Sequence, residues 1–173
     1  MSASTTARTT SGFTPFILRD GAIAATSIAL FVVALPILSG DGFAADFLGL
    51  FLGVGVAYAL SLPHEWGHML GARLSGATIH PKPSLKKLFA YDFDYTKSTN
   101  AQWIACSVSG FAGTGIALVL AYTLLPDGVF ASRVARSLIG LLALLGLVAE
   151  VPLLIRVLRM GLPLTPEQAA RLF

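Results

Sequence analysis

The residue types best suited to chemistry lie in one short segment, residues 64–68, where His64 and His68 are four positions apart and Glu65 follows the first of them. In a helix, two histidines at this spacing project from one face, so both imidazoles can reach the same zinc ion. Glu65 beside them can take a proton from a water molecule that the metal activates. The segment predicts zinc ligands at His64 and His68 and a general base at Glu65, with a third protein ligand still required.

A simpler interpretation is that these are ordinary helix-end residues at a membrane interface, where histidine and tryptophan are common. The surrounding sequence favours the metal site. Ionisable residues at the lip of an apolar run cost free energy and tend to be retained for function.

Composition decides which elements must position these side chains. Of the 173 residues, 55% are hydrophobic and only 12% are charged, and the mean hydropathy is +0.76. Soluble domains have about 25% charged residues, so the bilayer is the expected solvent. The length suits one compact helical unit, and a net charge of +3 carried near apolar segments does not imply nucleic acid.

The apolar stretches predict an all-α membrane protein with about four transmembrane helices. Asp20 is expected to cap an uncleaved first helix, and residues 64–68 lie late in the second. The expected spans are residues 20–38, 43–74, 101–125 and 134–158. The chain then divides into a polar N-terminal segment (1–19), a membrane domain (20–160) and a short C-terminal helix (161–173), which a capping box at residues 165–168 begins.

Residues 76–100 form the long polar connection between the second and third spans. Alternating side chains at residues 91–95 predict a short strand or hairpin at the interface, able to pair with an extended substrate. His80 is expected to be a surface histidine. The lysine cluster Lys82, Lys86 and Lys87 is expected to lie against anionic lipid headgroups.

The distribution of basic residues predicts the orientation. Most flank the first span's start, the second span's end and the fourth span's end, whereas the two other connections contain few. Segments rich in basic residues stay on the cytoplasmic side of a membrane. The protein is therefore expected in a bacterial or archaeal inner membrane, with both termini on the cytoplasmic side. Arg136, on the outer side of span four, is the exception. The basic residues on the inner side are Arg8, Arg19, Arg73, Lys82, Lys86, Lys87, Lys97, Arg156, Arg159 and Arg171.

Small residues in span three indicate close helix packing. They are Ala105, Ser109 and Gly113 at intervals of four, with Gly110 and Gly115 beside them. The lone cysteine, Cys106, allows no internal disulfide and is interpreted as a small packing residue.

Residues 64–68, together with the small-residue continuation at 69–76, resemble the zinc helix of the site-2 protease family of intramembrane zinc metalloproteases. Residues 109–113 show a weaker likeness to the segment that opens that family's next helix. Together these stretches cover about a third of the chain. The resemblance implies a membrane metalloprotease with Zn²⁺ as cofactor and a transmembrane segment of another protein as substrate.

The family usually takes its third ligand from an Asp in a Leu-Asp-Gly segment, and the fourth span contains no aspartate. Glu150 is the only acid in that span, and a lone buried carboxylate needs a cation nearby. By depth in the bilayer it can meet His64, so Glu150 is the expected third ligand. Asp127, in the segment Leu-Pro-Asp-Gly at residues 125–128, superficially resembles the family's Leu-Asp-Gly segment. It lies in the outer connection, however, and is interpreted as a turn residue.

Pro63 and Pro152 flank His64 and Glu150. Each either frees backbone groups beside a water-filled cavity or kinks its helix, and the sequence leaves both readings open.

Two functions from different classes fit these features. One is an active intramembrane zinc endopeptidase. The other is a protease-derived, non-catalytic subunit of a larger membrane complex, which the missing aspartate motivates. A metal or proton transporter with a His64–Glu65–Glu150 relay is a weaker alternative, since the chain lacks internal repeats.

Overall fold

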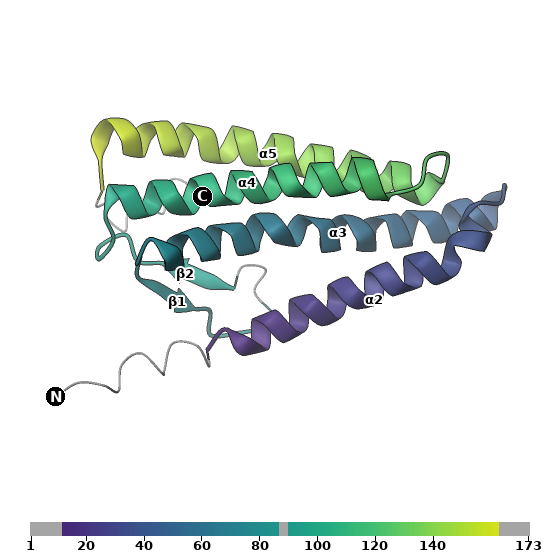
Figure 1. Ribbon diagram of the computed structural model, residues 1–173, viewed down its shortest axis with the longest axis horizontal. Helices are drawn as coiled ribbons and strands as arrows, with labels where there is room; N and C mark the ends of the chain where they lie inside the picture. The colour runs from purple at the N-terminus through teal and green to yellow at the C-terminus, as the bar shows by residue number, and fades with distance from the viewer. Residues whose placement is uncertain (1–11, 87–89, 163–173) are drawn as a thin grey trace.

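The computed structural model describes residues 12–86 and 90–162. In this part of the chain, four long helices run side by side along the molecule, and a small hairpin lies beneath α3, beside the start of α2 (Figure 1). The prediction of an all-α membrane fold with a hairpin-like loop between the second and third membrane helices is confirmed. The elements are α2 (Thr14–Leu38), α3 (Phe43–Leu74), β1 (Ile79–Pro81), β2 (Tyr91–Phe93), α4 (Asn100–Leu124) and α5 (Phe130–Met160).

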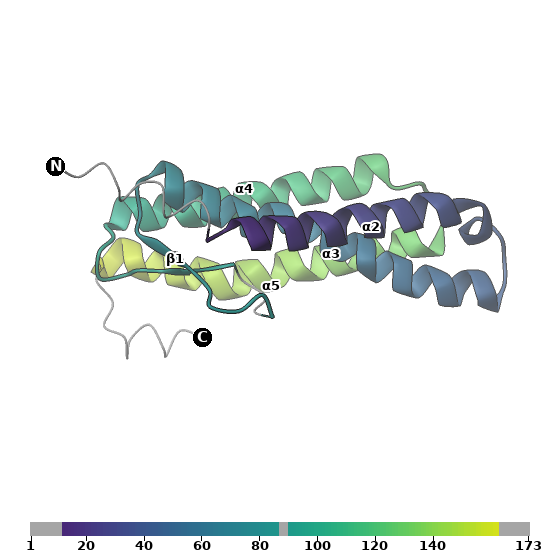
Figure 2. The same ribbon diagram turned by 90° about the horizontal axis from the view of Figure 1, so that it is seen from below.

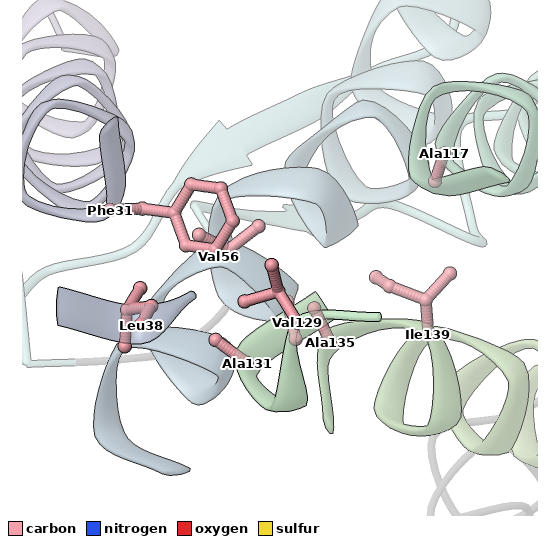
Figure 3. Packing of buried hydrophobic residues seen from close by; sticks show 9 residues of the cluster. Phe31, Leu38, Val56, Ala117, Val129, Ala131, Ala135 and Ile139 are labelled. Atoms are coloured by element: carbon pink, nitrogen blue, oxygen red, sulfur yellow. The ribbon is translucent and has the colours of Figure 1, made fainter. Parts of the chain in front are cut away.

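All four helices are long and apolar enough to cross a bilayer. Large apolar side chains point outward, for example Val33, which is 78% exposed, and Leu124, which is 70% exposed. The core contains many small residues instead, and Ala117, Ala131 and Ala135 are almost fully buried in it (Figure 3). This distribution suits lipid, where burying large apolar groups gains little and small residues let backbones approach.

Helix α2 begins at Thr14, six residues before the predicted start, because Pro15 in its first turn suits a helix N-terminus. The prediction that Asp20 caps this helix is therefore wrong. Asp20 lies buried inside α2, where its carboxylate accepts a hydrogen bond from the Trp66 indole at 3.0 Å. Arg19 pairs with the same carboxylate at 2.6 Å. These bonds satisfy a charge that would be costly if it were left unpaired in this setting.

Helix α5 begins at Phe130, four residues before the predicted start. This places Arg136 within its first two turns, where the guanidinium donates to the carbonyls of Ala121 at 3.1 Å and Leu125 at 2.7 Å. It also donates to Asp127 at 2.7 Å. The last carbonyls of a helix have no partner within that helix. Arg136 thus caps α4 from the neighbouring helix, which explains a cation at this end of the bundle.

Replacing Arg136 with alanine should lower the free energy of unfolding by about 2 kcal/mol, because carbonyls at the end of α4 lose a charged donor. Thermal unfolding in detergent would measure the change. Arg133→Ala is the matched control. Arg133 is exposed, and within the described residues its side chain contacts the neighbouring Phe130 ring and no carbonyl of α4. Equal melting temperatures for the two variants would contradict this role of Arg136.

The hairpin pairs β1 with β2 in antiparallel register, with Ile79 opposite Phe93 and Pro81 opposite Tyr91. Asp94, just beyond β2, accepts hydrogen bonds from the Thr96 hydroxyl and from two main-chain N–H groups. The Thr96 hydroxyl is the main cause that lowers the pKa of this carboxyl. These bonds fix the turn that leads into α4.

The polar side chains of the hairpin pair with one another. His80 is exposed, as predicted, and lies 3.3 Å from Asp94, and Lys82 pairs with Asp92. Lys87 and the predicted C-terminal helix starting at residues 165–168 lie outside the described residues.

Candidate metal centre

Three helices form the centre. His64 and His68 lie on α3 and Glu150 lies on α5, and α3 packs against both α4 and α5 (Figure 2). At 1.5 Å per residue, His64 and Glu150 each lie about 30 Å from the start of their own helix. The earlier start of α5 brings the two depths closer together than the predicted spans did. The structure thus brings the two histidines and Glu150 to one level of the bundle.

The distances among the three groups suit a single metal ion. His64 Nε2 lies 3.0 Å from Glu150 Oε1, and His68 Nε2 lies 3.3 Å from Glu150 Oε2. The two Nε2 atoms are 3.2 Å apart. Ligand atoms at about 2.0–2.1 Å from a tetrahedral zinc ion are about 3.3 Å from one another. The contacts join four atoms, because each histidine faces a different oxygen of Glu150, and their lengths match the separation of ligand atoms around one zinc ion.

The hydrogen bonds of the two Nδ1 atoms determine which ring nitrogen of each histidine carries the proton. His64 Nδ1 lies 3.1 Å from the Gly110 carbonyl and 2.8 Å from the Thr114 hydroxyl, and His68 Nδ1 lies 3.0 Å from the Cys106 carbonyl. A carbonyl only accepts, so each Nδ1 carries the proton and donates it, which leaves a lone pair on each Nε2. Metal-ligating histidines are held in this way.

Four atoms with lone pairs lie in contact here, namely two imidazole nitrogens and the two oxygens of Glu150. Such atoms repel one another unless a proton or a cation lies among them. Within the described residues, Glu150 Oε2 is buried and has no hydrogen bond of good geometry, although it lies close to His68. A proton on one Nε2 would satisfy only one of the three contacts. A divalent metal would satisfy all of them, so the donor set fits zinc.

Glycines let α3 and α4 approach closely enough to form these bonds. A Cβ on Gly110 would overlap the His68 imidazole, and a Cβ on Gly113 would overlap the main chain at Pro63. On the facing helix, a Cβ on Gly67 or Gly71 would overlap the main chain or side chains of α4. The small-residue stripe that predicted close packing therefore packs against the metal-site helix. Gly115 has no atom near its missing Cβ and takes no part.

Gly110→Ala should abolish stoichiometric zinc binding, because the added methyl group occupies the space of the His68 ring. Metal analysis of the purified variant would measure the loss. Gly115→Ala places the same substitution on the same helix in open space, so it should keep wild-type zinc content. Full zinc occupancy in Gly110→Ala would contradict the described packing.

Glu65 lies beside the ligands at the junction of two cavities. A largely apolar cavity of about 510 Å³ is lined by His64, Glu65 and side chains of α3, α4 and α5. A second cavity of about 590 Å³ is lined by all three predicted ligands and by side chains of the hairpin. The ligand side chains are 15–25% exposed. A water molecule and a substrate can therefore reach both the metal position and the Glu65 carboxylate.

Asp127, the other acid considered as a third ligand, lies away from this centre. It is 92% exposed, precedes the start of α5 and pairs with Arg136, in agreement with its interpretation as a turn residue. Both prolines lie inside uninterrupted helices, α3 and α5, and neither Pro63 nor Pro152 lines the two cavities described above.

The groups that orient the histidines were missed by the sequence analysis. Cys106, Gly110 and Thr114 lie at intervals of four on one face of α4 and supply the acceptors for both Nδ1 atoms. The predicted packing stripe was one position away from this face. Main-chain carbonyls leave no mark in a sequence, so only Thr114 offered a signal.

Over the described residues, fold and site define a membrane protein with four long helices and a half-buried His–His–Glu candidate metal centre. Comparison of the chain with protein-family models, curated proteins and solved structures gives no match. Its function must therefore be argued from the chemistry of the site.

Proposed function

We propose that the protein is an intramembrane zinc endopeptidase with His64, His68 and Glu150 as zinc ligands and Glu65 as general base. The observation that carries this proposal is that the Nε2 atoms of both histidines meet the Glu150 carboxylate, while main-chain acceptors on α4 fix the orientation of both rings. A zinc ion bound there would supply the Lewis acidity that makes water nucleophilic near neutral pH and polarises a peptide carbonyl.

The protein's own residues would transfer the proton, orient the ligands and exclude water. Glu65 is adjacent to His64 in sequence and lines both cavities, so its carboxylate can take a proton from the attacking water and return it to the leaving amine. The acceptors on α4 would hold each imidazole in one tautomer and one orientation. The apolar walls would limit the water around the reacting groups.

The resemblance of residues 64–76 to the zinc helix of the site-2 protease family supports the same function. The departure from that family concerns the third ligand, where Glu150 would replace the usual aspartate. A glutamate has one more methylene group than an aspartate, and both offer carboxylate oxygens suited to zinc. The substitution therefore preserves the chemistry that the site requires.

A transmembrane segment of another protein is the proposed substrate. The apolar cavity is lined by Leu141, Leu142 and Leu145, which are 48–53% exposed on the outer surface of α5. It therefore reaches the surface that would face lipid. Along β2, the main-chain groups of Tyr91 and Phe93 face away from β1. The alternate positions carry the cross-strand bonds, because Ala90 accepts from Lys82 N–H and Asp94 N–H donates to Thr78, the two residues that flank β1. An extended substrate could pair with this edge.

We also propose a cytoplasmic membrane as the location, with the hairpin and both termini on the cytoplasmic side. The basic residues near the hairpin end, such as Arg19, Arg73 and Arg159, support this orientation. Arg136 at the other end is engaged with Asp127 and the end of α4, so its charge does not argue for the reverse.

The test is metal analysis of purified protein combined with hydrolysis of a fluorescently labelled single-span peptide that contains helix-breaking Gly-Pro residues. We expect one zinc per chain and cleavage that a chelator abolishes and added zinc restores. Protein that carries no stoichiometric zinc after refilling would refute the proposal.

A further inference from the structure

Among the described residues, the two cavities at the centre share three of their lining residues, namely His64, Glu65 and Tyr91. The first two are a predicted ligand and the predicted base on α3. The third comes from strand β2. A peptide that extends from the apolar cavity into the hairpin cavity must pass all three side chains, so its reacting bond would lie between α3 and Tyr91.

The Tyr91 phenol lies beside Cys106, which in turn lies beside the predicted ligand His68. Its oxygen lies 3.6 Å from Cys106 Sγ, and that sulfur lies 3.9 Å from His68 Nδ1. A thiol is a weak hydrogen-bond partner both as donor and as acceptor, so this contact leaves the hydroxyl free to donate to a stronger acceptor that enters the cavity.

The phenol also keeps that proton. Burial against the hairpin and α4 is the main cause that raises the pKa of Tyr91 above its usual range, and the neighbouring Cys106 and Glu65 act in the same direction. At neutral pH the group is therefore a neutral hydrogen-bond donor that, like Glu65, lines both cavities.

We propose that Tyr91 is a catalytic residue whose hydroxyl donates a hydrogen bond to the substrate carbonyl oxygen as that oxygen becomes anionic. The inference rests on the proposed endopeptidase function and adds to it the donor that the two-histidine motif does not provide. Donors aimed at a developing oxyanion contribute strongly to acyl-transfer catalysis.

The step balances as follows. The water oxygen forms a bond to the carbonyl carbon and its proton passes to Glu65, while the carbonyl π electrons move to the oxygen that Tyr91 contacts. When the carbonyl re-forms, the C–N bond breaks, and the nitrogen retains the electron pair and takes the proton from Glu65. Tyr91 gives up no proton in the cycle and only strengthens and then releases its hydrogen bond.

Tyr91→Phe tests the proposal, since it removes the hydroxyl alone. We expect kcat for the single-span peptide to fall about 100-fold, with KM and zinc content unchanged. As a readout independent of turnover, zinc-loaded protein should bind a peptide phosphonamidate, which carries a tetrahedral anionic centre, about 100-fold more weakly in the variant. Affinity for the uncleaved peptide, measured in a Glu65→Gln background, should not change.

Tyr122→Phe is the matched control. Tyr122 lies near the end of α4, is 62% exposed and lines neither cavity, and phenylalanine keeps the ring that contacts the Arg136 guanidinium. It should retain wild-type kcat and phosphonamidate affinity.

Each other outcome is decisive. Wild-type kcat and phosphonamidate affinity in zinc-loaded Tyr91→Phe would overturn the role of Tyr91 alone, and so would loss of zinc from this variant, which would assign the phenol to metal binding. Wild-type protein that binds zinc and the phosphonamidate but cleaves nothing would instead refute the proposed function, while the affinity comparison would still decide whether Tyr91 donates to the anion.

Discussion

Glu150→Ala is expected to weaken zinc binding by about 100-fold or more, since even loss of a group that only supports a metal ligand costs about 10–100-fold in affinity. In the structure, Glu150 contacts both histidines, at 3.0 and 3.3 Å. Its removal would leave two imidazoles for an ion that takes three protein ligands in catalytic sites. Competition with a chromogenic chelator, together with metal analysis after dialysis, would measure the change.

Asp127→Ala is the control for this experiment. It removes an acid from the Leu-Pro-Asp-Gly segment at residues 125–128, which resembles the Leu-Asp-Gly segment that usually supplies the third ligand. Asp127, however, is exposed and lies before the start of α5. Zinc affinity should be unchanged. If Asp127→Ala lost zinc and Glu150→Ala kept it, the ligand set derived from the geometry would be wrong.

Glu65→Gln is expected to keep one zinc per chain and to lower kcat for peptide hydrolysis by about 10²–10⁴-fold, the contribution typical of general acid–base catalysis. The amide has nearly the same size as the carboxylate but cannot accept a proton from water. Glu65 is not among the three groups that converge on the metal position, so occupancy should not depend on its charge. Parallel measurements of zinc content and turnover would separate the two effects.

Asp46→Asn is the matched control, because Asp46 is also an acid of α3 but lies in the first turn, at the far end of the helix from the metal centre. It should retain full activity. The Glu65→Gln result also distinguishes the proposed endopeptidase from a non-catalytic subunit of a membrane complex. Unchanged cellular function of Glu65→Gln, with the protein at fixed stoichiometry in an assembly, would favour the subunit.

Much of the fold could be predicted from the sequence. Apolar runs of this length can cross a bilayer only as helices, because every backbone group must be satisfied within the membrane. The alternation at residues 91–95 correctly indicated a strand, and its partner β1 was the unforeseen half of the hairpin. Helix starts were predicted less well. Helix α2 begins earlier than predicted, because Pro15 suits its first turn, and Asp20 is a buried partner of Trp66 and not a cap. Helix α5 also begins earlier, which places Arg136 where it caps the end of α4.

The sequence by itself determined that His64, Glu65 and His68 share one helix near the lip of an apolar span, since helical periodicity fixes that arrangement locally. It also identified Glu150 as the one acid available from the fourth span. Only the tertiary structure decided that Glu150 reaches both Nε2 atoms, that carbonyls of α4 hold both Nδ1 atoms, and that Tyr91 and Glu65 both line the two cavities. These relations join residues about 25 to 90 positions apart in the sequence, and they depend on how the helices and the hairpin pack and not on local periodicity.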